Sequence, residues 1–325
     1  MATLSDVAVR AQVSKATASR ALSRPELVAP ATVARVRAAA ADLDFVANRA
    51  ARHLARGRTG ILGLLVPTLG NAFFAPIIGG AQIRAEEADL QLSVAVLPLE
   101  DPAELGRFDR LATGVDGFLV VAPRGPDSLV AEAAARKPVI LVDREVDGLG
   151  SVVADTAGAF AELLRGLAAA GHRRILYIGG PDRSWQNAQR TAALHAAATA
   201  VDVSLAVLGP YPATFDAGAG LVDRVASSDV DAVLPYASDL GLGLLLGLIG
   251  RGLARVGDGA PTAGGDRLIT VVGVPGTPRV DVDGERLGAA ALDQLISAPA
   301  GAAEPTRARL HVPVSWAGER PRQAH

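Results

Sequence analysis

The 325-residue chain has no cysteine, so it can form neither a disulfide framework, a thiol nucleophile nor a Cys-based zinc site. The apolar run Leu240–Ile249 is too short to span a bilayer and is broken by glycines. Its five histidines are scattered without metal-ligand spacing, at His53, His172, His195, His311 and His325. We therefore predict no metal site and no membrane segment.

Enzyme signatures are also lacking. The stretch Gly241–Gly247 misses the dinucleotide fingerprint, and no Gly-rich loop ends in Gly-Lys-Ser/Thr. No Ser/His/Asp arrangement can be argued from the sequence. The N-terminus does not show the basic patch, apolar run and cleavage site of a signal peptide. We predict a cytoplasmic protein with no catalytic residues and no cofactor.

Charge is distributed unevenly along the chain. Residues 1–58 hold ten Lys or Arg and four Asp or Glu, which gives this front segment a net charge of +6. Because the whole chain carries −2, the remainder carries −8. A basic front segment joined to an acidic body is typical of a DNA-binding module attached to a body that does not bind DNA.

Residues 4–22 predict two short helices joined by a tight turn. Leu4, Val7 and Ala8 recur at the spacing of one helix face, and Ser5 is the predicted N-cap. The turn covers Ala11–Ser14, and a second helix covers Lys15–Leu22. Its outward side chains are expected to be Lys15, Ala16, Thr17, Ser19 and Arg20. Short polar and basic side chains suit base edges and phosphates in a major groove, although a capped helical hairpin with a solvated face fits the spacing equally well.

The same stretch resembles the opening T-L-x-D-V-A-x-x-A-x-V-S-x-x-T-V-S-R-x-L-N of the LacI/GalR family of bacterial transcription regulators. The matching positions are Thr3, Leu4, Asp6, Val7, Ala8, Ala11, Val13, Ser14, Thr17, Ser19, Arg20 and Leu22, with departures at Ala18 and Ser23. The resemblance implies a helix-turn-helix DNA-binding domain over residues 1–47, with Ser5 and the outward side chains of the second helix on the DNA. It favours this interpretation over the plain hairpin.

A third helix is predicted over Pro30–Leu43, where Val33, Val36 and Ala40 form an apolar stripe. A hinge helix and linker over residues 48–59 follow by resemblance. Arg49–Ala55 is too short for a stable isolated helix, so it is expected to order on DNA. The resemblance implies DNA contacts from Asn48, Arg49, Ala51 and Leu54, and Leu54 matches the leucine that wedges into the minor groove.

From residue 60 onward, apolar runs alternate with Ala-rich helical stretches, which indicates parallel sheets covered on both faces. The predicted strands are Ile61–Val66, Leu92–Leu97, Phe118–Val121, Val139–Val142, Arg174–Ile178, Ser204–Leu208, Ala232–Pro235 and Ile269–Gly273. The fold class is therefore α/β, with turn-like stretches near 147–156 and 279–284. The body resembles the two-lobed periplasmic sugar-binding protein fold, with effector binding and dimerisation expected in residues 60–325.

That resemblance implies three crossings between lobes, near Asp155, Asp281 and Arg307. Lobe 1 is expected at about 60–155 and 284–307, and lobe 2 at about 156–281 and 309–325. A ligand would lie between the lobes, at the carboxyl ends of the strands. Its expected contacts at family-like positions are Asn71, Phe73, Phe74, Asp143, Arg190 and Asp239, to which we add Trp185, whose ring can stack on a ligand, and Pro275. His172 is expected to be structural.

Val272–Gly276 departs from the family, because it lacks the paired carboxylates of which the first commonly binds a sugar hydroxyl. We therefore expect common hexoses to bind at least about tenfold more weakly than the true effector, since an unpaired hydroxyl costs roughly 1–3 kcal/mol. We also expect Arg190→Ala to abolish the effector response. The effector is expected to be a sugar or a related polar metabolite.

The sequence thus predicts a homodimeric regulator, usually a repressor, on a near-palindromic double-stranded operator. Alternatives are the solute-binding protein of a transport system, which the N-terminal motif and the absent export signal disfavour, an effector-independent regulator, and an enzyme.

Overall fold

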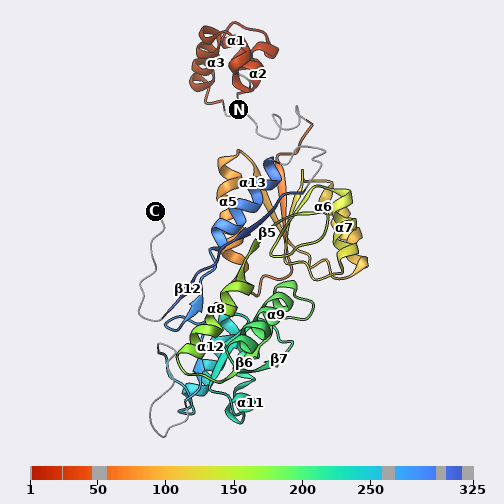
Figure 1. The fold of residues 1–325 in the computed structure, drawn as a ribbon. Coiled ribbons are helices and arrows are strands. Elements are labelled where there is room, and N and C mark those ends of the chain that lie inside the picture. The colour runs from red at the N-terminus through yellow and green to blue at the C-terminus, as the bar shows by residue number, and fades with distance from the viewer. Residues whose placement is uncertain (1, 24, 46–56, 258–267, 298–304, 317–325) are drawn as a thin grey trace. The chain divides into compact units, whose positions relative to one another are not determined.

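The computed structural model describes residues 2–23, 25–45, 57–257, 268–297 and 305–316. It divides into two compact units, residues 1–60 and residues 61–325, which we call the head and the body (Figure 1). Each is described by itself below.

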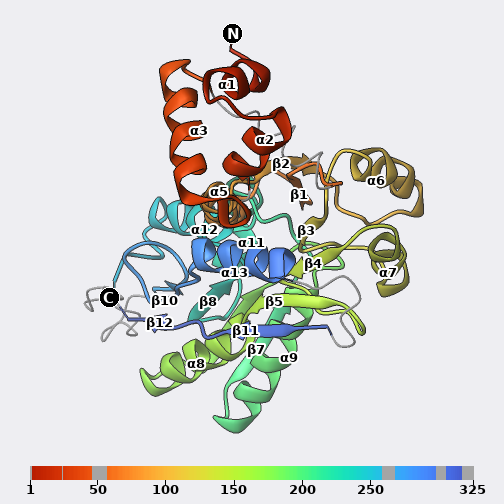
Figure 2. The same cartoon turned by 90° about the horizontal axis from the view of Figure 1, so that it is seen from above.

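The head, over the residues that the structure describes, is a small fold of three α-helices (Figure 2). It consists of α1 (Leu4–Arg10), α2 (Lys15–Ser23), the 3-10 turn η1 (Pro25–Leu27) and α3 (Pro30–Asp42). Each helix turns an apolar stripe inward, and the buried side chains are Val7, Ala8, Ala11, Ala18, Ala21, Val33, Val36, Ala39 and Ala40. Pro30 stands in the first turn of α3, where its missing N–H leaves no helical bond unmade. The predicted helices and turn of the head are confirmed.

The predicted N-cap of α1 is wrong. Thr3, not Ser5, caps this helix: Thr3 Oγ1 accepts from the Asp6 N–H at 3.4 Å, and the Asp6 carboxylate accepts from the Thr3 N–H at 2.8 Å. Ser5 lies inside the helix, because Leu4 already has helical geometry. The capping box explains why Asp6 stands three residues after Thr3.

Lobe 1 of the body is built on a parallel sheet with strand order β11-β5-β4-β3-β1-β2. In chain order its strands are β1 (Ile61–Val66), β2 (Gln91–Val96), β3 (Phe118–Val121), β4 (Val139–Val142), β5 (Gly150–Ala154) and β11 (Arg307–Leu310). Alternate residues of β1 face opposite sides, and both sides are buried: Leu64 packs in one core cluster and Leu65 in the other. A strand covered on both faces needs the continuous apolar sequence that was used to predict it.

Two helix layers cover the sheet of lobe 1. Helices α5 (Phe74–Glu87) and α13 (Gly284–Ser297) lie side by side although they are far apart in sequence (Figure 1). Gly80 and Gly288 permit this close approach, since a Cβ at either would lie within about 2 Å of the other helix's backbone. The other face carries η2 (Pro102–Glu104), α6 (Leu105–Ala112) and α7 (Asp127–Arg136).

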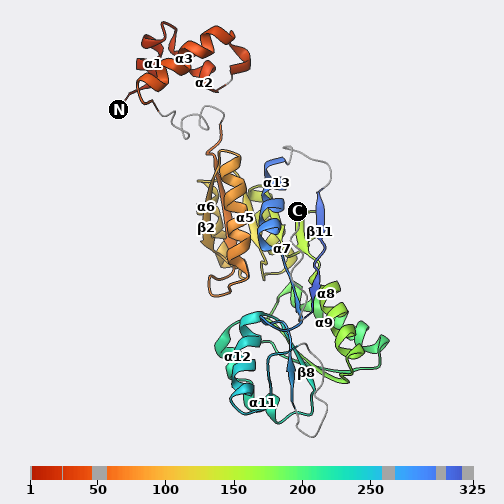
Figure 3. The same cartoon turned by 90° about the vertical axis from the view of Figure 1, so that its left-hand side faces the viewer.

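Lobe 2 has a parallel sheet of strand order β7-β6-β8-β9. The strands are β6 (Arg174–Ile178), β7 (Ser204–Leu208), β8 (Ala232–Pro235) and β9 (Thr270–Val271). Helices α8 (Thr156–Ala169) and α9 (Trp185–Ala200) pack on one face, where Ile175 and Tyr177 are buried. The other face packs against α10 (Phe215–Ala219), α11 (Val222–Ala226) and α12 (Ser238–Ile249) (Figure 3).

The structure departs from the predicted strands in three places. Residues 147–156, expected to be turn-like, contain strand β5, which pairs with β4 on one side and the edge strand β11 on the other and whose short Gly-Ser-Val-Val-Ala run has few bulky residues. Arg307–Leu310 is an edge strand of lobe 1, so the chain crosses to lobe 2 after Leu310 and not near Arg307. A small antiparallel pair, β10 (Arg279–Val280) with β12 (Val314–Ser315), joins the second and third crossings. Within the described part of the chain, no helix is long and apolar enough to cross a membrane.

Candidate DNA-binding surface and ligand cleft

One side of α2 is fully outward. Lys15, Ala16, Ser19 and Arg20 are exposed and Thr17 is half-buried, whereas Ala18 and Ala21 are completely buried on the opposite side. The start of the helix is fixed by Ser14, whose Oγ accepts from the Thr17 N–H at 3.0 Å and lies 2.8 Å from Thr17 Oγ1. A rigid helix start with short side chains and two cations is the geometry needed to enter a major groove.

Ser5 is exposed on α1, as a DNA contact requires. The predicted hinge contacts Asn48, Arg49, Ala51 and Leu54 lie outside the described residues. Their roles on DNA stay predictions.

A cleft runs between the two lobes at the carboxyl ends of their strands. Lobe 1 contributes residues that follow β1, β3 and β4, and lobe 2 contributes residues that follow β6 and β8. This is where parallel α/β sheets bind ligands. The cleft holds two adjoining cavities of about 460 and 390 Å³. Both are lined by Asn71, Phe74, Ala122, Asp143, Gln186 and Tyr236.

The two cavities differ in chemistry. The larger, the aromatic chamber, is walled by aromatic and proline side chains, namely Trp185, Tyr211, Pro67, Pro181, Pro210 and Pro212. The smaller, the charged chamber, is lined by Arg190, Asp239, Arg279 and Asp281 together with Phe73 and Pro275. Arg124 and Asp182 also line the first chamber, and Phe74, Phe160 and Tyr236 also line the second, so each offers both flat rings and hydrogen-bonding groups.

A continuous chain of hydrogen bonds, the cleft network, links the lobes through Asp143, Gln186, Thr156 and Arg190. Asp143 Oδ1 accepts from Gln186 Nε2 at 3.0 Å, and Gln186 Oε1 accepts from Thr156 Oγ1 at 2.9 Å. Thr156 Oγ1 in turn accepts from Arg190 Nε at 2.8 Å. All four residues are at most 6% exposed. Asp143 follows β4 of lobe 1, whereas the other three belong to α8 and α9 of lobe 2.

Asp143 is held in an unusual conformation. Its φ of +56° lies in the left-handed region, which Asp tolerates better than most residues. Its Oδ1 also accepts from the Ala154 N–H at 2.9 Å. Burial raises the pKa of Asp143 to about 6, even though the Ala154 N–H, the Arg190 charge and the Gln186 amide lower it.

Arg190 is clamped between aromatic rings. Its guanidinium carbon lies 4.6 Å from the ring centroids of both Phe160 and Tyr236, and Nη1 donates to the Tyr236 carbonyl at 2.8 Å. Cation–π contacts of this kind stabilise a desolvated arginine. The arginine is therefore a structural clamp of lobe 2 as well as a lining residue of the charged chamber.

The predicted ligand residues all line the cleft. Asn71, Phe74 and Asp143 line both chambers and Trp185 lines the aromatic chamber. The charged chamber adds Phe73, Arg190, Asp239 and Pro275. Asn71 Oδ1 accepts from the Phe73 N–H at 3.0 Å, which fixes the loop after β1. Whether these residues contact an effector stays a prediction.

Sequence reasoning missed several cleft residues, namely Thr156, Phe160, Gln186, Tyr236, Arg279 and Asp281. A signal existed for Gln186, which precedes Arg190 by four residues and therefore shares its helix face. Arg279 and Asp281 had none, because their mutual bond of 2.7 Å at the second crossing depends on a short strand that the sequence did not predict.

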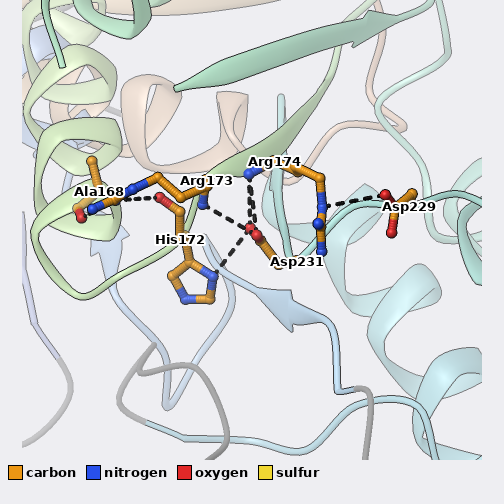
Figure 4. Close-up of polar contacts among 6 residues, drawn as sticks. All are labelled: Ala168, His172, Arg173, Arg174, Asp229 and Asp231. Atoms are coloured by element: carbon orange, nitrogen blue, oxygen red, sulfur yellow. Dashed lines mark hydrogen bonds and ion pairs between the residues drawn. The ribbon is translucent and has the colours of Figure 1, made fainter. Parts of the chain in front are cut away.

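The segment Gly171–Ile175, whose motif reads Gly-His-Arg-Arg-Ile, leads into the start of β6, whereas the cleft lies at the carboxyl ends of the strands. Figure 4 shows the polar contacts of this segment. Asp231, which precedes β8, accepts from the Arg173 N–H at 3.1 Å and the Arg174 N–H at 3.1 Å, and lies 3.3 Å from His172 Nδ1. The motif thus fastens the end of α8 to the sheet, a structural role for His172. No cluster of three or more His, Asp or Glu among the described residues could hold a metal ion.

Two family models match the chain. Residues 3–48 match "Bacterial regulatory proteins, lacI family", and residues 59–302 match "Periplasmic binding proteins and sugar binding domain of LacI family". Together they cover the head and most of the body described above.

Curated relatives agree. The HTH-type transcriptional regulator PtxS of Pseudomonas plecoglossicida is 34% identical over 199 residues, 60% of this chain and 58% of that protein. The match to MalI of Escherichia coli likewise spans 56% of its length, so the chain aligns with little more than half of these two relatives. The HTH-type transcriptional regulator GntR of Pseudomonas aeruginosa is 30% identical over 92% of this chain and 90% of its own length.

Among solved structures, the lac repressor dimer bound to operator and the anti-inducer ONPF has the same fold. It superposes with a TM-score of 0.75 at 23% identity, over 97% of this chain and 98% of that one. The sequence models, the full-length relative and the shared fold agree with the motifs of the head and the cleft between the lobes. The chain belongs to the LacI family of bacterial regulatory proteins.

Proposed function

We propose that the protein is a sequence-specific DNA-binding transcription regulator, a repressor that binds a near-palindromic operator as a homodimer and responds to a small polar molecule in the cleft. The observation that carries the proposal is the divided surface of α2, with Lys15 and Arg20 exposed and Ala18 and Ala21 completely buried. A regulator of DNA works where the chromosome is, so the proposal includes the cytoplasm as the compartment.

On DNA, Lys15 and Arg20 donate to guanine edges, and Thr17 and Ser19 contact phosphates. Ser5 contacts the backbone from α1. The hinge residues Asn48, Arg49 and Ala51 follow into the minor groove with Leu54 as the wedge, so Leu54→Ala weakens operator binding by a few kcal/mol and leaves dimerisation intact.

Exposed apolar side chains on lobe 1 support the homodimer. Ile83 on α5 is 55% exposed and Val94 on the edge strand β2 is 41% exposed, and these two elements are in contact. Exposed apolar side chains on neighbouring elements suit the contact between two protomers, and two heads are needed for a palindromic operator.

The effector is proposed to lie in the charged chamber, where Asp239 and Arg279 offer an acceptor and donors beside Phe73 and Pro275. In the lobe 2 loop 272–276 the sequence offers no carboxylate, so common hexoses are expected to bind weakly.

The test is selection of operator sequences from a random double-stranded library with the full-length protein, followed by footprinting and sedimentation. We expect a palindromic consensus protected by a dimer. An asymmetric half-site bound by a monomer contradicts the proposal, as does failure to enrich any sequence. A thermal-shift screen of sugars, nucleosides and small acids then identifies effectors that change operator binding.

A further inference from the structure

Gln186 of lobe 2 and Asp143 of lobe 1 are the members of the cleft network whose side chains meet between the lobes, and every polar atom of the Gln186 amide is used. Nε2 donates to Asp143 Oδ1 at 3.0 Å and to the Ala154 carbonyl at 3.2 Å, while Oε1 accepts from Thr156. The side chain is 5% exposed. A buried amide with all partners satisfied is rigid and expensive to displace.

These bonds occupy Asp143. One carboxylate oxygen already accepts two hydrogen bonds from protein donors, the Ala154 N–H and the Gln186 amide. Gln186 donates to this oxygen the kind of hydrogen bond that a ligand hydroxyl or amine could donate. A ligand that needs this oxygen must first displace Gln186.

Gln186 also stands where the two chambers meet. It lines both, next to Phe74 and Tyr236, which line both as well. Phe74 belongs to the core of lobe 1, so it cannot move without cost. Two of the shared residues, Gln186 and Tyr236, belong to lobe 2, and the Gln186 amide bonds to Asp143 of lobe 1 at the boundary of the chambers.

We propose that Gln186 is the specificity-determining residue of the cleft. Its amide takes the position of a ligand group on Asp143 and walls the charged chamber off from the aromatic chamber. The inference rests on the proposed effector function of the cleft. The ligand it favours is a compact polar molecule of one ring, held in the charged chamber without a bond to Oδ1 of Asp143. Ligands that extend from one chamber into the other are excluded.

Trp185 provides a reporter that needs no effector, because it lines the aromatic chamber beside Gln186. The chain has two tryptophans, so Trp316→Phe leaves Trp185 as the single indole. In this background we compare the parent with Gln186→Ala, Gln186→Met and Gln189→Ala. Methionine keeps the length of the wall, and Gln189 lies on the same helix but lines neither chamber.

Acrylamide quenching measures how accessible the Trp185 indole is when the Gln186 side chain is present or shortened. We expect the quenching constant of Trp185 to rise in Gln186→Ala and to stay at the parent value in Gln186→Met and Gln189→Ala. An unchanged constant in Gln186→Ala overturns the assignment of the wall. Circular dichroism and the urea midpoint of each variant establish that it is folded.

Calorimetry with glucose and cellobiose measures specificity. We expect Gln186→Ala to bind the two-ring probe cellobiose roughly tenfold more tightly than the parent, and Asp143→Asn added to it to cancel the gain. Gln186→Met should stay at the parent value for cellobiose. Equal cellobiose binding in the parent and Gln186→Ala, including no binding by either, overturns the specificity role. If the parent protein fails to select an operator, the proposed regulatory function is contradicted. The quenching and calorimetry experiments would still test the role of Gln186.

Discussion

Helix α2 of the head and helix α9 of the body carry similar polar side chains under opposite conditions. On α2, Arg20 and Lys15 are exposed and the helix start is held by Ser14. On α9, Arg190 and Gln186 are buried and hydrogen-bonded to residues of four other segments, namely Thr156, Tyr236, Asp143 and Ala154. The first surface can change its specificity without changing its fold, whereas each change in the cleft also alters how the lobes are held together.

Arg190→Ala tests the buried side with the largest expected effect. It removes bonds to Thr156 and to the Tyr236 carbonyl together with two cation–π contacts, so the free energy of unfolding of the body should fall by about 2–4 kcal/mol. Urea unfolding measures it, with Arg165→Ala, an exposed arginine on α8, as the control. A loss of stability no larger than that of the control would show that the contacts of Arg190 do not stabilise the body.

Arg20→Ala tests the exposed side. Operator affinity should fall by about 1–3 kcal/mol and the preference at one base position should relax, while the stability of the head stays unchanged. Binding to the selected operator and to its single-base variants measures both parts. Equal weakening on every sequence would instead make Arg20 a phosphate contact.

Asp143→Asn sharpens the comparison through pH. Burial raises the pKa of Asp143 to about 6 from its ordinary 3.8. Between pH 3.8 and about 6 the native state therefore holds a proton on Asp143 that the unfolded state has released. The stability that Asp143 contributes is therefore present at low pH and lost as the pH rises through 6. Between pH 4.5 and 7.5 the parent should lose roughly 1–2 kcal/mol relative to Asp143→Asn. Parallel pH curves for the two proteins would argue against the raised pKa.

Arg10→Ala has the smallest expected effect. Arg10 pairs with Asp42 at 3.0 Å, but both side chains are more than half exposed. Solvent-exposed ion pairs contribute little, so Arg10→Ala should lower the free energy of unfolding of the head by less than about 0.5 kcal/mol. The shift in the thermal midpoint of the head measures this loss. A large loss would mean that head surface charges also hold the fold.

The same contrast explains what could be predicted from sequence. The helices of the head and strands such as Ile61–Val66 and Phe118–Val121 follow from apolar spacing, and the structure confirms them. The strand Arg307–Leu310 was missed because an edge strand with alternating arginines has no continuous apolar run.

In the cleft, motif resemblance predicted residues such as Asp143 and Arg190 that do line its chambers. It did not predict which of their polar atoms bond to protein, because Asp143 and its partner Gln186 are 43 residues apart in the chain. Such pairings depend on how two lobes close on each other, and local propensity contains no information about that.

The late place of β11 in the chain affects the order in which the parts of the protein can fold during synthesis. Lobe 1 begins with β1 at Ile61, but its sheet is completed by Arg307–Leu310, which pairs with β5. On the ribosome the head emerges whole at the start, whereas lobe 1 waits for almost all of the rest of the chain. At 5–20 residues per second this interval lasts roughly 10–50 s. A nascent chain thus presents a finished recognition helix long before the lobes that would control it can fold.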